Sequence, residues 1–113
     1  MIAEASRDSS EMVGIVYDNL ATVRRLQGQF TGATTASDRA LAILSATDPN
    51  GQTYGGALNN RALLLDAAGQ AAAAVEYSDR ALGILRQSLK NDPAALAPFL
   101  EDNRLFRQKA QGR

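Results

Sequence analysis

Three asparagines recur along this chain at nearly equal spacing. Asn60 follows Asn19 by 41 residues, and Asn103 follows Asn60 by 43 residues. An asparagine side chain offers a hydrogen-bond donor and an acceptor together, so a row of them can hold the backbone of an extended peptide without reading its sequence. The same side chains can instead satisfy backbone groups or water between helices. The asparagines are therefore candidate peptide-binding residues, with a structural role as the alternative.

Catalytic chemistry finds little support in the residue types present. Neighbouring acids such as Glu101 and Asp102 have the chemistry for acid/base work. The sequence contains no histidine and no cysteine, however, which removes the commonest general base, the usual zinc ligands and any thiol nucleophile. The Tyr-Gly-Gly stretch at residues 54–56 is no phosphate-binding loop, because neither the required spacing nor its lysine follows. We predict no enzyme activity, no metal and no cofactor.

The charge balance argues against two classes of partner. Lys plus Arg total 12 and Asp plus Glu total 12, so the formal net charge is zero. Neither nucleic acid nor an anionic membrane is expected to attract such a chain strongly. The start of the sequence lacks the basic and apolar segments of a secretion signal, and no run of about 18 apolar residues is present. We predict a soluble cytoplasmic protein that binds neither nucleic acid nor membrane.

The elements that position these residues follow from an internal repeat. The phrase SDRALAIL at residues 37–44 returns as SDRALGIL at 78–85, 41 residues later. The same shift aligns residues 17–44 with residues 58–85, and a shorter third copy follows at 101–113. A period of about 20 to 50 residues indicates a solenoid of stacked units. The Ser-Asp-Arg part of the phrase is expected to face water.

Each unit divides into two helices at a glycine. Gly28, Gly69 and Gly112 each close an apolar-periodic stretch, where a left-handed cap residue is needed. The predicted helices cover about residues 9–27, 31–46, 53–68 and 71–90, and a final helix that Asp92 caps and that Pro93 or Pro98 opens.

The predicted helix starts differ in strength. Asp8 and Ser9 supply capping oxygens for the first helix, whereas Gly55 and Gly56 predict a loosely formed start for the third. We predict one domain over residues 1–113, with repeats at about 9–46 and 53–90 and a partial third repeat at about 93–113.

These units resemble the tetratricopeptide repeat, in the longer form of about 42 residues seen in kinesin light chains and many bacterial regulators. The stretch ALNNRALLLDAAGQ at 57–70 is similar to the family's LNNLALLYxxxGR, and both second helices carry its seam of small residues, which lets helices approach closely. The seam residues are Ala33, Ala40, Leu41, Ile43 and Leu44, and Ala74, Ala81, Leu82, Ile84 and Leu85. The resemblance implies an all-α solenoid of about two and a half repeats, or roughly five helices.

The resemblance also implies a site, the concave groove lined by one face of each first helix. Its candidate residues are Asp18, Asn19, Thr22, Arg25, Asn59, Asn60, Leu63, Asp66, Asp102, Asn103, Phe106 and Lys109. The implied function is a protein–protein interaction module that binds a peptide or a partner helix. The family's carboxylate clamp is not expected, because Asp18, Phe99 and Asn103 stand where that clamp needs cations. The mixed, slightly acidic groove favours a neutral or mildly basic peptide.

Two alternatives remain from the sequence. In the first, the chain self-associates as a homodimer through its terminal helices, because two and a half repeats leave a final unpaired helix that bears Phe99, Leu100, Leu105 and Phe106. In the second, the chain is a segment of a longer bacterial protein, a signalling regulator or the regulatory arm of an enzyme, whose activity lies elsewhere.

Overall fold

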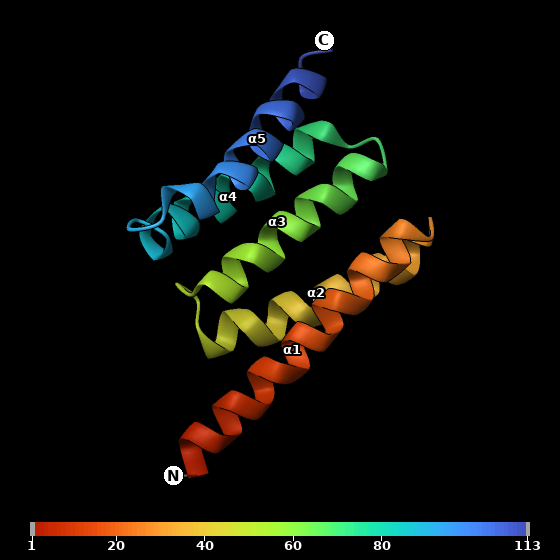
Figure 1. Cartoon of the computed structure of the whole chain (residues 1–113). Coiled ribbons are helices and arrows are strands. Elements are labelled where there is room, and N and C mark those ends of the chain that lie inside the picture. The colour runs from red at the N-terminus through yellow and green to blue at the C-terminus, as the bar shows by residue number, and fades with distance from the viewer. Residues whose placement is uncertain (1, 113) are drawn as a thin grey trace.

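The computed structural model describes residues 2–112, and describes side-chain surroundings from residue 9 onward. Its elements are α1 (Ile2–Leu26), α2 (Phe30–Thr47), α3 (Gln52–Ala67), α4 (Ala71–Ser88) and α5 (Pro93–Ala110). The described residues contain no strand, so the predicted all-α repeat architecture is confirmed. Figure 1 shows α1, α3 and α5 side by side in one layer, with α2 and α4 behind them. The first helices of successive units therefore share one face of the molecule.

Glycine ends the first helix of each unit, as predicted. Gly28, Gly69 and Gly112 have φ angles of 75°, 81° and 75°, in the left-handed region that only glycine adopts at little cost. After α1 the amide of Gly28 donates to the carbonyl of Arg25 (2.9 Å), and the amide of Gln29 donates to that of Arg24 (2.8 Å). These two hydrogen bonds satisfy carbonyl groups in the last turn of the helix. The chain can then reverse and begin α2.

The predicted helix start is wrong for α1 and confirmed for α5. α1 begins at Ile2 rather than near Ser9, so Asp8 and Ser9 lie within the helix and do not cap it. α5 begins at Pro93, where the side chain of Asp92 accepts a hydrogen bond from the amide of Ala95 (3.2 Å). Pro98 lies inside α5.

Close helix contact explains two glycines that the sequence analysis left aside or treated as weaknesses. A Cβ atom on Gly55 would lie 2.9 Å from Leu85 Cδ2, and one on Gly14 would lie 2.7 Å from Leu44 Cδ2. Real Cβ atoms do not approach so closely, hence each glycine lets a first helix touch its own second helix. α3 begins at Gln52, without a side-chain hydrogen bond at its cap, and continues through Gly55 and Gly56, so the loosely formed start stays a prediction.

The core follows the predicted small-residue seam. Ala33, Ala40 and Leu44 of α2 are buried, as are Ala74, Ala81 and Leu85 of α4. One cluster joins Ala40 and Leu44 to Ala57 of α3, and another joins Leu58 of α3 to Ala81 and Leu85. Each second helix thus packs between two first helices, which fixes the spacing of α1, α3 and α5.

Candidate functional site

The surface that α1, α3 and α5 share is here called the first-helix face. Three side-chain hydrogen bonds cross between its neighbouring helices. Asn60 Nδ2 donates to Asp18 Oδ2 at 2.9 Å, joining α3 to α1. Between α5 and α3, Asn59 Nδ2 donates to Asp102 Oδ2 and Lys109 Nζ donates to Asp66 Oδ2, each at 3.0 Å. The structure therefore brings six of the twelve predicted residues together as three inter-helix pairs.

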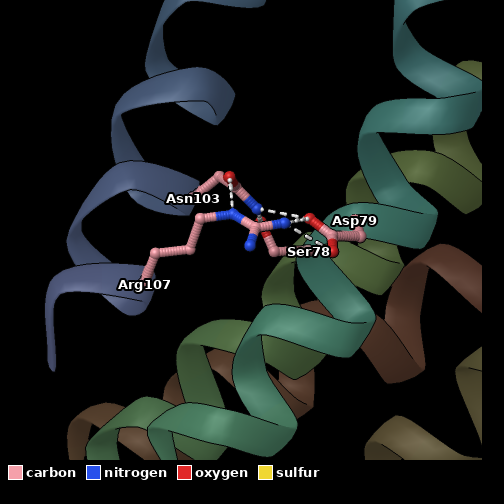
Figure 2. Close-up of polar contacts among 4 residues, drawn as sticks. All are labelled: Ser78, Asp79, Asn103 and Arg107. Atoms are coloured by element: carbon pink, nitrogen blue, oxygen red, sulfur yellow. Dashed lines mark hydrogen bonds and ion pairs between the residues drawn. The ribbon is translucent and has the colours of Figure 1, made fainter. Parts of the chain in front are cut away.

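Asn103 lies inside the molecule rather than on this face. Its Nδ2 donates to Ser78 Oγ and to Asp79 Oδ1, both at 2.9 Å, and its Oδ1 accepts from Arg107 Nε at 3.0 Å. Figure 2 shows how these side chains of α5 converge on the two residues of α4. Asn103 is 9% exposed and its donors and acceptor are all used. It holds α5 on α4, which is the structural role that the sequence left open.

The remaining predicted residues have differing environments. Asn19 is exposed and forms no hydrogen bond with any residue from 9 to 112. Thr22 Oγ1 donates to its own helix at the carbonyl of Asp18 (3.3 Å). Arg25 and Leu63 are half-buried, and Phe106 is buried against Ala62 and Ala74. The three recurring asparagines therefore do not form one continuous row.

The final helix is not the unpaired apolar surface that the sequence suggested. Phe106 is 2% exposed, and Phe99 packs against the cluster that contains Leu85. Of the four residues named for dimerisation, the two exposed ones are Leu100 (39%) and Leu105 (38%). The premise of that dimer is wrong for the two aromatic residues, because α5 already packs on α4.

The sequence analysis also missed the ion pairs that join first helices to second helices. Arg61 Nη1 lies 2.8 Å from Asp38 Oδ1, and Arg107 Nη2 lies 2.6 and 2.7 Å from the two carboxylate oxygens of Asp79. Both acids belong to the Ser-Asp-Arg phrase, and they are exposed as expected, at 63% for Asp38 and 47% for Asp79. The serines of that phrase, Ser37 and Ser78, are buried. A signal for these ion pairs was present in the sequence. Asp38 and Asp79 occupy the same position in the two repeats, and the next first helix after each contains its basic partner, Arg61 or Arg107.

Electrostatics on the first-helix face centre on Asp18. Burial raises the pKa of this carboxyl above its ordinary value of 3.8, and the hydrogen bond from Asn60 opposes that shift. At the far end of the array, hydrogen bonds from Arg104 lower the pKa of Glu101, and both side chains are exposed. The surroundings of Asp18 therefore disfavour its ionised form.

The described residues contain neither a metal-binding group of side chains nor a membrane-spanning helix. No group of three or more acidic side chains able to hold a metal ion occurs among them. No helix in the described part of the chain is long and apolar enough to cross a membrane. What the arrangement does provide is a set of paired polar side chains that link three successive first helices.

Comparison with known proteins agrees with this geometry. A family model described as tetratricopeptide repeat matches residues 12–87. No curated protein matches the chain. The family match starts within α1 and ends one residue before the end of α4, so it includes both helical hairpins. The chain belongs to the tetratricopeptide repeat family, whose repeats are non-catalytic scaffolds for protein–protein interaction.

Proposed function

We propose that this chain is an interaction module that binds a segment of a partner protein across the first-helix face. The observation that carries the proposal is the set of three inter-helix hydrogen bonds, Asn60 to Asp18, Asn59 to Asp102 and Lys109 to Asp66. They fix side chains of three successive helices before any ligand arrives. A surface ordered in advance loses less conformational entropy on binding.

The surface of α3 at Gly56 leaves space for a ligand. This residue precedes Asn59 by three positions and Asn60 by four, so it lies on the same helix surface, between the side chains that reach α5 and α1. A Cβ atom placed on Gly56 would have no neighbour within 4 Å. Leu63, two turns farther along, adds a half-buried apolar side chain. A peptide backbone can therefore approach α3 closely here.

The charges of this face favour a neutral or mildly basic ligand. The residues assigned to this face include three acids, Asp18, Asp66 and Asp102, and two cations, Arg25 and Lys109. Lys109 is already paired with Asp66, whose side chain is 17% exposed. A strongly acidic peptide would meet unfavourable charge, whereas a nucleic acid would find too few cations.

We further propose that the repeats are of the long form, related to those of kinesin light chains and bacterial regulators. Gly14 and Gly55, Gly28 and Gly69, and Leu44 and Leu85 have equivalent positions in the fold and are each 41 residues apart. A bacterial origin and a cytoplasmic location stay predictions.

The test uses peptides selected from a random library displayed on phage and then titrated by calorimetry. Gly56→Gln fills the open space above α3 and should weaken binding by at least ~10-fold. It should not disturb the fold, because glutamine favours a helix more than glycine does. Gly83→Gln is the matched control, since Gly83 of α4 also has no neighbour within 4 Å of an added Cβ. Equal binding by the two variants would reject this face as the site.

A further inference from the structure

The outer surface of α1 carries an apolar stripe that the residues from 9 to 112 leave largely exposed. Val13, Val16, Leu20 and Val23, here called the α1 stripe, lie three and four residues apart and therefore share one side of the helix. Val16 is 64% exposed and Val23 is 49% exposed. A shallow hollow lined by Ser9, Met12, Val13, Val16 and Tyr17 opens on the same surface. Large exposed apolar surfaces of this kind mark interaction sites.

The repeat shows what covers such a stripe elsewhere in the molecule. The corresponding residues of α3, 41 positions on, are Tyr54, Ala57, Arg61 and Leu64. Tyr54 and Ala57 pack against Ala40 and Leu44 of α2. Arg61 pairs with Asp38 of α2, as described above, and Leu64 is 3% exposed. The surface that is open on α1 is thus the surface that α2 buries on α3.

A polar contact repeats in the same way. Asn60 of α3 donates to Asp18 of the preceding first helix. Asn19 is the equivalent of Asn60, and it is exposed beside the α1 stripe without a partner among the residues from 9 to 112. The apolar half and the polar half of the unit-to-unit interface are therefore both present on α1 and both unfilled.

We propose that the α1 stripe and Asn19 dock a helical hairpin of another protein. Its second helix presents a seam like that of α2 and α4, with alanine and, four residues on, leucine, as in Ala40 with Leu44 and Ala81 with Leu85. Its first helix presents a carboxylate that accepts from Asn19, as Asp18 accepts from Asn60. The interface that joins units within the chain continues onto α1. This surface borders the first-helix face at α1 and extends the module's reach to a second partner.

A second copy of the chain fits this surface less well. The seams on α2 and α4 are already buried, with Ala40, Leu44, Ala81 and Leu85 at most 1% exposed. On α5, Arg104 and Glu101 form an exposed two-bond ion pair at 2.9 and 2.7 Å, which would have to lose water in a head-to-tail contact. Two α1 stripes would face each other with branched side chains and no small residue to let the helices close.

The test is a titration of the full chain with a fluorescent peptide of the α2 sequence, residues 30–47, stapled on its polar side to keep it helical. Saturable binding by fluorescence anisotropy is expected. Val16→Asp should weaken it by at least ~10-fold, because the carboxylate would be buried without a partner. Leu105→Asp, at an exposed aliphatic residue of α5, is the matched control and should bind like the parent chain.

A second peptide separates seam packing from general apolar adsorption. The same peptide with Ala40→Phe should lose binding, since a large side chain prevents close approach of the helices. Absence of binding, equal binding by Val16→Asp, or stronger binding of the phenylalanine peptide would each overturn the proposal. A dimer in sedimentation analysis that Val16→Asp dissociates would overturn it in favour of a second copy. Gly56→Gln should leave this peptide's binding unchanged, which keeps this test separate from that of the first-helix face.

Discussion

Two adjacent glycines of α3 give the sharpest test of how the helices pack. Gly55 and Gly56 lie in the same turn and differ only in what surrounds them. A Cβ on Gly55 would lie 2.9 Å from both Leu85 Cδ2 and Leu85 Cγ, and 3.2 Å from Ile84 Cγ2. A Cβ on Gly56 would meet nothing within 4 Å. Substituting alanine at each position therefore separates helix propensity from packing.

The gain in helix propensity is opposed by an overpacking cost at Gly55 but not at Gly56. Alanine in place of glycine stabilises a helix by about 1 kcal/mol, and Gly56→Ala should show this gain nearly in full. At Gly55 the same gain meets an overpacking cost of about 1–3 kcal/mol, because the added Cβ would press on Leu85, which is fully buried. We expect Gly55→Ala to be less stable than Gly56→Ala by about 1–3 kcal/mol.

Urea denaturation followed by circular dichroism measures this difference directly. In thermal unfolding the gap corresponds to about 4–8 °C per kcal/mol for a domain of this size. Gly14→Ala should behave like Gly55→Ala, since its Cβ would lie 2.7 Å from Leu44 Cδ2. If Gly55→Ala gained as much stability as Gly56→Ala, the close contact between α3 and α4 would not exist as described.

Two further predictions concern polar side chains. Asn103→Ala should lower the free energy of unfolding by about 2–3 kcal/mol, because it removes three hydrogen bonds and leaves the buried Ser78 hydroxyl without its partner. Exposed Asn19→Ala should change the free energy of unfolding by less than about 0.5 kcal/mol, and equal effects of the two substitutions in urea denaturation would contradict the assigned burial. Asp18→Asn should stabilise the fold at neutral pH, because burial raises the pKa of Asp18 and so makes its charged form costly once the pH exceeds that raised value. The advantage should vanish as the pH falls below the ordinary value of 3.8, where both chains are uncharged at this position, and urea denaturation across this range that showed a constant advantage would refute the burial argument.

The three asparagines show where sequence reasoning about the site fell short. They align in the sequence repeat, yet Asn60 bonds to Asp18, Asn103 bonds to Ser78 and Asp79, and Asn19 is exposed. In the contacts, Asp102 rather than Asn103 takes the place of Asn60, because its partner Asn59 lies 41 residues after Asp18. Asn103 takes the place of Arg61, since each bonds to the acid of the Ser-Asp-Arg phrase. The two residues inserted before the third copy therefore shift its contacts by one position, which the alignment of asparagines did not reveal.

What the sequence determined by itself was the scaffold. The 41-residue period set the units, the glycines at 28, 69 and 112 ended the first helices because only glycine adopts their left-handed backbone at little cost, and the alanine seam set the helix contacts. Only the tertiary structure decided which surfaces stay open. Pairing on the first-helix face, burial of Phe106 and exposure of the α1 stripe depend on neighbours brought together from distant parts of the chain. Local propensity and periodicity carry no information about such neighbours, because side chains compete for partners only once the helices are packed.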